Sequence, residues 1–320
     1  MNVNRVGLFF CLLACLGSAS AETMYKYRVQ LTDKKKTVYS LEHPEEFLSS
    51  RALARRAHQG LTVDSTDLPV CRVYIDRLKA QGGKYVSSSK WNNTVLMEVP
   101  DESVALRFLG NPFVRSVKKV WVSPDSIPAR GAGRKELVKN QWKKQEDYYG
   151  MASEQIKIHN GDSLHLAGFK GQGMQIAVID AGFYNVDAMK IFRKTSILGT
   201  HDFVNPDSDI YGEHNHGMKV LSCMAANVPH VMVGTAPEAS YWLLRSEDND
   251  TEQPVEEDNW AAAIEFADSV GVDIVNTSLG YYSFDDPVDN YTYRELDGHT
   301  SLMAASASSV SYTHLRAHET

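Results

Sequence analysis

The segment that decides the fold reads MQIAVIDAG and occupies residues 174–182. Its apolar core, 176–179, is uninterrupted, which is typical of a strand that is buried on both faces of a parallel sheet. Asp180 follows this core directly, and a glycine stands two positions later. In open α/β sheets, functional groups collect where the strands end. The sequence therefore predicts a parallel sheet with Asp180 at its functional edge.

Strands and helices alternate through the rest of the C-terminal half. Residues 241–244 (YWLL) and 272–276 (VDIVN) are further apolar segments of strand length. Between them, 256–270 places apolar residues at helical spacing and acidic residues in its first turn. A second helix is expected over 217–227, and another over 301–308. This alternation predicts an α/β fold with a doubly wound parallel sheet.

The N-terminal half has a different pattern. Residues 22–124 contain short alternating segments and two helix-like stretches, one of which ends at a pair of glycines and one of which starts at a capping Asp101. We predict a small α+β domain of the split β-α-β type. Its expected elements are strands at 25–31, 85–86, 94–99 and 114–122, and helices at 70–81 and 101–109.

Two stretches lack such patterns. Residues 125–150 combine prolines and glycines with many lysines and arginines, and we interpret them as a linker rather than a nucleic-acid-binding tail. Residues 309–320 carry no apolar run where another buried strand is expected, and we interpret them as a non-native tail. The parallel-sheet domain is thus expected to span 151–308 and to be incomplete.

The N-terminus carries an export signal. Residues 1–21 have a basic start, an apolar run and small residues that end in Ala-x-Ala, which is the layout of a cleaved secretory signal peptide. The apolar run is too short to span a membrane. A lipid anchor at Cys15 is the less favoured interpretation. We expect an exported protein, in the periplasm, at the cell surface or outside the cell, without a transmembrane span.

Charge and cysteine usage exclude other classes. The net charge of −7 argues against nucleic-acid binding. Outside the signal region only Cys71 and Cys223 remain, and they fall in different predicted domains. We therefore expect buried free thiols rather than a disulfide.

Three segments hold residues that could carry chemistry. Asp180 is placed to orient another group, and His216, in EHNHGMKV (213–220), could act as a general base near neutral pH. NTSLG (276–280) offers a strand end to which an extended peptide could pair. Each has an ordinary alternative, respectively a turn-capping carboxylate, a surface histidine and a plain strand end.

Taken in order, these segments resemble the subtilase family of serine proteases. IAVIDAG (176–182) matches its catalytic-Asp segment, with Ala181 where Thr or Ser is commoner. HGMKV (216–220) matches its catalytic-His segment, with Met218 in place of the usual Thr. GTAP (234–237) and SLG (278–280) match the family's G-x-A-P turn and its substrate-binding strand, and the layout of 22–122 is similar to a subtilase propeptide.

The resemblance implies a subtilisin-like endopeptidase that hydrolyses polypeptides through an acyl-enzyme. Asp180 would orient His216, and Ser278, Leu279 and Gly280 would bind substrate. The chain's own propeptide would act as an intramolecular inhibitor and chaperone. The resemblance implies no cofactor for the chemistry, and it allows structural calcium, for which no ligand set is named here.

The resemblance is incomplete at its C-terminal end. The family's oxyanion-hole Asn strand and its nucleophile motif, G-T-S-x-[SA]-x-P, do not occur in the sequence. The segment most similar to the nucleophile motif, 298–304, lacks the motif's Pro. Its Ser301 also stands too close to Ser278 for the oxyanion-hole Asn strand to fit between them. We expect a C-terminally truncated precursor that holds the catalytic Asp and His only and is inactive.

Two other functions remain open from the residues alone. A metal-dependent hydrolase could use His214 and His216 with Asp180, Asp202 or Glu213, although no third ligand is fixed by spacing. A non-catalytic secreted scaffold or binding protein could keep the same fold, since fold does not imply function.

Overall fold

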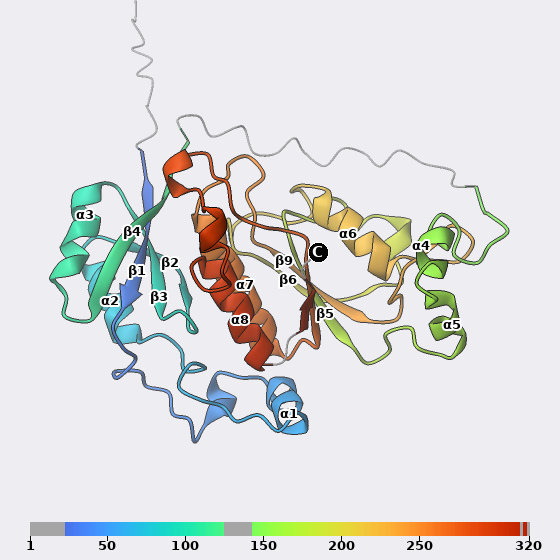
Figure 1. Cartoon of the computed structure of the whole chain (residues 1–320), viewed down its shortest axis with the longest axis horizontal. Helices are drawn as coiled ribbons and strands as arrows, with labels where there is room; N and C mark the ends of the chain where they lie inside the picture. Colours follow the sequence, from blue (N-terminus) through green and yellow to red (C-terminus); the bar gives the residue numbers. More distant parts are fainter. Residues whose placement is uncertain (1–22, 125–142, 314–315, 319–320) are drawn as a thin grey trace, which may run out of the picture.

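The computed structural model describes residues 23–124, 143–313 and 316–318. Figure 1 shows an α+β unit, coloured blue to green, beside a unit built on a parallel sheet. Two helices of the second unit lie between its own sheet and the sheet of the first. The chain is therefore organised as two units that share a long contact.

The N-terminal unit is built on an antiparallel sheet. Its strands are β1 (Tyr25–Leu31), β2 (Lys84–Ser89), β3 (Thr94–Val99) and β4 (Val114–Val122), in the order β2-β3-β1-β4. The helices are α1 (Ser50–His58), α2 (Arg72–Ala80) and α3 (Glu102–Arg107), with short 3-10 turns η1 (Pro44–Glu46) and η2 (Phe108–Gly110). The predicted α+β domain is confirmed.

The core of this unit lies between the sheet and the two helices α2 and α3. Val29, Val95 and Met97 of the sheet are fully buried against Leu78 of α2 and Val104 of α3. Asp101 caps α3, since its side chain accepts a hydrogen bond from the Val104 N–H at 3.2 Å. Alternating strand residues and helix residues at periodic positions thus form one apolar layer.

The C-terminal unit holds a five-stranded sheet in the order β11-β10-β5-β9-β6, with every pair parallel. Its strands are β5 (Gln175–Asp180), β6 (Ser196–Asp202), β9 (Ser240–Arg245), β10 (Ile274–Thr277) and β11 (Arg316–His318). A separate hairpin pairs β7 (Asn227–Val228) with β8 (Met232–Val233). The central strand β5 is the segment from which the sequence analysis began.

Helices cover both faces of this sheet. The unit contains α4 (Ser153–Lys157), α5 (Gly161–Leu166), α6 (His216–Ala225), α7 (Val255–Val270) and α8 (Leu302–Thr313), with 3-10 turns η3 (Lys190–Phe192), η4 (Pro287–Asp289) and η5 (Tyr293–Glu295). Helix α6 packs on Val178 and Leu243, whereas α7 and α8 pack on Ala177, Ile179 and Leu244. The predicted doubly wound sheet is confirmed.

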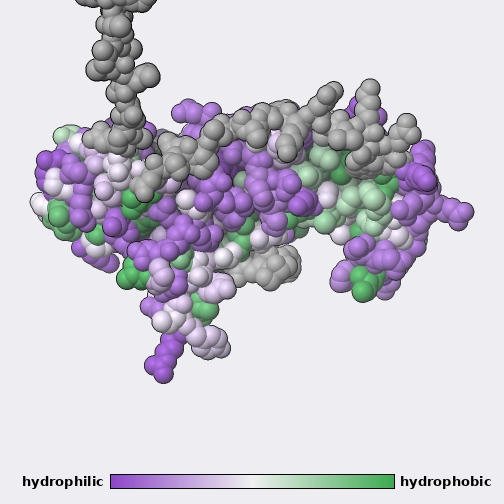
Figure 2. All heavy atoms as spheres, turned by 90° about the horizontal axis from the view of Figure 1, so that it is seen from above, coloured by the Kyte–Doolittle hydropathy of each residue, from purple (hydrophilic) through white to green (hydrophobic). Residues whose placement is uncertain are grey.

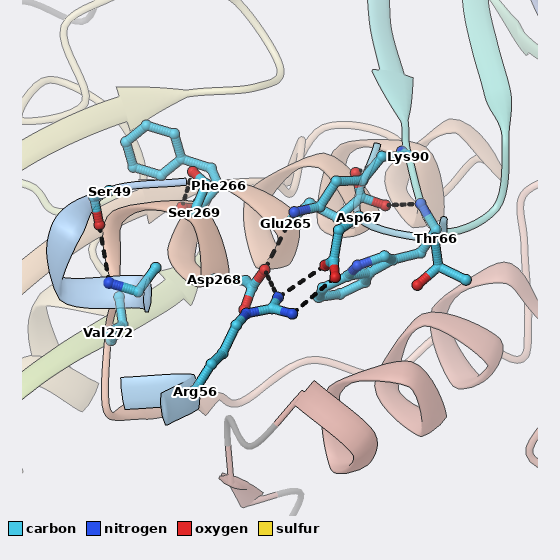
Figure 3. Close-up of polar contacts among 12 residues, drawn as sticks. Ser49, Arg56, Thr66, Asp67, Lys90, Glu265, Phe266, Asp268, Ser269 and Val272 are labelled. Atoms are coloured by element: carbon cyan, nitrogen blue, oxygen red, sulfur yellow. Dashed lines mark hydrogen bonds and ion pairs between the residues drawn. The ribbon is translucent and has the colours of Figure 1, made fainter. Parts of the chain in front are cut away.

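A buried ion cluster joins the two units (Figure 3). Asp268 of α7 accepts hydrogen bonds from Arg55 and Arg56 of α1, at 2.6 and 2.8 Å, and from Lys90, at 3.2 Å. Arg56 also binds Asp67 through two bonds of 2.8 Å. Helix α7 therefore packs against the sheet of its own unit and also binds the N-terminal unit through this ion cluster.

Two details differ from expectation. Cys71 is buried as predicted, but Cys223 is exposed, because it lies on the solvent side of α6. Helix α8 continues to Thr313, beyond the expected end at 308. Both cysteines are free thiols.

The sequence predicts a protein without a transmembrane span, and the described helices can be compared with that expectation. Within residues 23–124, 143–313 and 316–318, no helix is long and apolar enough to span a bilayer. Most of the face in Figure 2 is hydrophilic, and hydrophobic atoms gather at the end that carries α4 and α5. Ile158 and Leu166, at the C-terminal ends of α4 and α5, and Phe169 are exposed. The predicted signal peptide, 1–21, and most of the predicted linker lie outside the described residues.

Candidate active site

Asp180 and His216 meet at the carboxyl edge of the parallel sheet. Asp180 is the last residue of β5, and His216 is the first residue of α6. Asp180 Oδ1 accepts a hydrogen bond of 2.8 Å from His216 Nδ1. The fold thus brings together two residues that stand 36 positions apart in the chain and that the sequence analysis selected as catalytic candidates.

Two glycines allow this close approach. A Cβ on Gly217 would lie 2.6 Å from the Gly182 carbonyl oxygen and 2.8 Å from the Asp180 Cβ. A Cβ on Gly182, where φ is +154°, would lie 2.5 Å from the His214 nitrogen. Neither position could carry a side chain without moving backbone, so α6 can start against the end of β5 only because both are glycine.

The carboxylate is buried and the imidazole is reached by solvent. The Asp180 side chain is 0% exposed and that of His216 is 42% exposed. Burial raises the pKa of Asp180, while hydrogen bonds from His216 and from the Ala181 N–H (2.8 Å) oppose the rise. In the described part of the chain, the His216 ring has its hydrogen bond at Nδ1 alone, so Nε2 is left for another group.

A histidine held in this way can move a proton. The carboxylate accepts a hydrogen bond from the Nδ1–H group, which fixes the tautomer that has its lone pair on Nε2. The same carboxylate stabilises the imidazolium that forms when Nε2 takes a proton. The pair therefore has the arrangement of a general base and the residue that orients it.

The alternative metal ligands do not converge. His216 Nδ1 is bonded to Asp180, and Asp202 accepts hydrogen bonds from Ser208 and, at 3.0 Å, from Arg245. His214 is exposed. Among residues 23–124, 143–313 and 316–318, no group of three or more His, Cys, Asp or Glu side chains is arranged to hold a metal ion.

The predicted substrate-binding segment follows β10, which pairs with β5. Thr277, the last residue of β10, is in register with Ile179, so Ser278, Leu279 and Gly280 continue at the same edge as Asp180. Gly280 is exposed, and a Cβ on it would meet no atom within 4 Å. The backbone there is open to approach by another chain.

Ser301 has a capping role. It is buried at the start of α8, and its Oγ accepts a hydrogen bond of 3.0 Å from the Ala304 N–H. Hydroxyl side chains commonly satisfy the free N–H groups of a first helical turn in this way.

Sequence reasoning missed Arg245, the last residue of β9. Its buried guanidinium donates to the Ala181 carbonyl oxygen and to Asp202, both at 3.0 Å, and lies 3.5 Å from Glu213. It thereby joins the turn after Asp180 to the loop before His216. A signal was present, because an arginine that ends an apolar strand must find acceptors when it is buried.

Comparison with known proteins identifies a match for each of the two units. Residues 26–136 match the model of the "Peptidase S8 propeptide domain, Bacteroidota", and residues 171–312 match that of the "Subtilase family". A "Major intracellular serine protease" of Bacillus subtilis (strain 168) is 30% identical over 133 residues. That stretch is 40% of this chain and 40% of the relative.

Solved structures share the fold. The epidermin leader peptide processing serine protease of Staphylococcus aureus matches 92% of this chain and 59% of its own, at 10% identity and a TM-score of 0.52. Fervidolysin of Fervidobacterium pennivorans, "a keratinolytic enzyme related to subtilisin", matches 92% of this chain and 39% of its own, at 16% identity and a TM-score of 0.52. This chain thus spans less than two thirds of each. It belongs to the subtilase family, with an S8 propeptide domain ahead of its subtilase domain.

Proposed function

We propose that the complete protein is a serine endopeptidase in which Asp180 and His216 are two members of the catalytic triad. The 2.8 Å hydrogen bond between them at the sheet edge carries this proposal. His216 takes the proton of a serine hydroxyl as the oxygen attacks a peptide carbonyl, and then gives it to the leaving amine. Family membership supports the same chemistry.

In this proposal the nucleophilic serine is not among residues 1–320. The family's nucleophile motif is absent from the sequence, and Ser301 is used as a cap. Loss of one triad member lowers the rate by about 10⁴–10⁶-fold. The 320-residue chain on its own is therefore expected to be inactive.

The substrate is a polypeptide that pairs with residues 278–280. Its extended backbone adds to the strand end beside Asp180, which places a peptide carbonyl near His216. The N-terminal unit acts as an inhibitor and folding aid, a role that its buried ion cluster with α7 supports. The protein is exported by its N-terminal signal, and the chemistry needs no cofactor; structural calcium remains without an assigned ligand set.

Labelling with a serine-directed fluorophosphonate tests this function. We expect the product of the whole gene to be labelled, and the 320-residue chain not to be. His216→Ala abolishes labelling because the serine loses its base, whereas His214→Ala, an exposed neighbour, leaves it intact. Labelling that survives in His216→Ala would contradict the proposal. A whole-gene product that is never labelled would favour the non-catalytic scaffold.

A further inference from the structure

Three neighbouring strands of the parallel sheet end in charged residues that lie in one row. Asp180 ends β5, Arg245 ends β9 and Asp202 ends β6. Arg245 is in register with Asp180 on one side and with Asp202 on the other. The strand next to the one that carries Asp180 therefore ends in a guanidinium at the edge where Asp180 and His216 meet.

The orientation of the Asp180 carboxylate depends on the turn that follows it. Its Oδ1 accepts hydrogen bonds of 2.8 Å from His216 Nδ1 and from the Ala181 N–H. Its Oδ2 is buried and has no hydrogen-bond partner in the part of the chain that the structure describes. Because the bonds that orient the carboxylate are on one oxygen, a shift of residue 181 would turn Oδ1 away from His216.

Arg245 holds this turn from the other side. Its Nε donates a hydrogen bond of 3.0 Å to the Ala181 carbonyl oxygen. The Arg245 side chain is 3% exposed, so water does not compete for this contact. The N–H donors of a planar guanidinium point in fixed directions, and they fix the place of each acceptor that they bind. Residue 181 is therefore held at both of its polar groups, by Asp180 at the N–H and by Arg245 at the carbonyl oxygen.

The same guanidinium reaches the loop that precedes His216. Its Nη2 lies 3.5 Å from Glu213 Oε2, three positions before His216. The loop also lies directly against the turn, because a Cβ on Gly182 would be 2.8 Å from the Glu213 Cβ. Arg245 thus contacts the segment that leaves Asp180 and the segment that leads to His216.

Asp202 fixes the place of Arg245. Its Oδ2 accepts a hydrogen bond of 3.0 Å from Arg245 Nη1 and another from Ser208. Its Oδ1 accepts two more, each of 2.8 Å, from the N–H groups of residues 204 and 205. The Asp202 side chain is also buried, so the guanidinium is bound to an acceptor that is itself held firmly.

We propose that Arg245 is a positioning residue, whose guanidinium sets the hydrogen bond between Asp180 and His216 by fixing the turn after one and the loop before the other. It acts through these two segments rather than by contact with the reacting atoms. The role rests on the proposed peptidase function, because the pair that it positions is the one that moves the proton. Misplacement of such a group by about 1 Å can cost about 100-fold in rate.

Charge balance is the competing explanation. The guanidinium lies 3.0 Å from Asp202, 3.5 Å from Glu213 and 3.7 Å from Asp248, and any cation there would offset their repulsion. A lysine carries the same charge on a single nitrogen, which cannot occupy the places of Nε, Nη1 and Nη2 at once. Arg245→Lys therefore keeps the charge and loses part of the geometry.

NMR of the His216 ring in the 320-residue chain measures this geometry. The exchange rate of the Nδ1 proton with water reports how tightly the Asp180 carboxylate holds it. We expect exchange to be at least about tenfold faster in Arg245→Met, since a hydrogen bond to a charged group is weakened, and to be intermediate in Arg245→Lys. Arg56→Met removes another buried guanidinium, from the contact between the units, and should leave the His216 rate unchanged.

Kinetics of the whole-gene product measure the consequence. In Arg245→Met we expect kcat on a peptide substrate to fall at least about 100-fold, with KM changed by less than about threefold, because residues 278–280 are untouched. Tyr241→Phe is the matched control on the same strand. It removes a hydrogen bond of 2.7 Å to the Ala236 carbonyl oxygen and should keep kcat within about threefold of the wild type.

An unchanged exchange rate in Arg245→Met, or an equal acceleration in Arg56→Met, would overturn the positioning role. The wild-type rate in Arg245→Lys would also overturn it, because charge alone would then suffice. If Arg245→Met does not fold, Arg245→Lys decides. Faster exchange in the Arg245 variants, in a protein whose whole-gene product is never labelled by the fluorophosphonate, sinks only the peptidase function. Labelling, with exchange and kcat unchanged in these variants, sinks only the positioning role.

Discussion

At the residue scale, the candidate site depends on a few side chains and on two positions that have none. Asp180 and His216 could be predicted because local motifs mark both of them. Arg245 could not, since its significance comes from its contacts with the Ala181 carbonyl oxygen and Asp202, in other parts of the chain. Short sequence patterns identify the candidate catalytic groups, whereas the groups that position them depend on the fold.

Gly217→Ala should separate Asp180 from His216 without replacing either residue. The new methyl group would lie 2.8 Å from the Asp180 Cβ and 2.6 Å from the Gly182 oxygen, so the start of α6 must shift. A displacement of about 1 Å can cost about 100-fold in rate. We expect at least that loss in kcat of the whole-gene product on a peptide substrate. Gly110→Ala, where a Cβ meets no atom within 4 Å, is the matched control and should be silent.

At the element scale, periodicity predicts long helices well and short or edge elements poorly. Helix α7 and strand β5 were predicted within one residue at each end. Helix α1 was not, because its nine residues include three arginines that form ion pairs with partners distant in sequence. Strand β6 was also missed, since it is an edge strand of mixed polarity. Tertiary contacts, rather than local preference, stabilise both.

Asp268→Asn should be one of the most destabilising single changes on α7. It leaves Arg55, Arg56 and Lys90 near a neutral amide in a buried place, and the loss of one partner of a buried ion pair costs about 3–5 kcal/mol. Urea unfolding measures the free energy of unfolding. Asp76→Asn breaks the exposed pair with Arg72 and should cost at most about 1 kcal/mol. Equal effects of the two changes would mean that the cluster does not stabilise the contact between the units.

At the scale of the whole molecule, the class of each unit could be predicted but their relative placement could not. Alternation of strands and helices distinguishes the doubly wound sheet from the α+β unit. The contact between them depends on pairs such as Arg28 with Asp258, which are 230 positions apart, and no local pattern marks such pairs. Helix α7 contributes to both the fold of its own unit and the contact between the units. Its Trp260 donates a hydrogen bond to Thr277 of β10, while its Asp268 binds Arg55 of the N-terminal unit.

The central claim is that the Asp180 carboxylate holds the His216 ring in one tautomer at the edge of the sheet. ¹⁵N NMR of the histidine ring in the 320-residue chain tests it directly. For the neutral ring we expect a proton on Nδ1 that exchanges slowly with water, and an unprotonated Nε2. We expect Asp180→Asn to abolish this tautomer preference. A neutral ring that carries its proton on Nε2, or a spectrum unchanged by Asp180→Asn, would contradict the account.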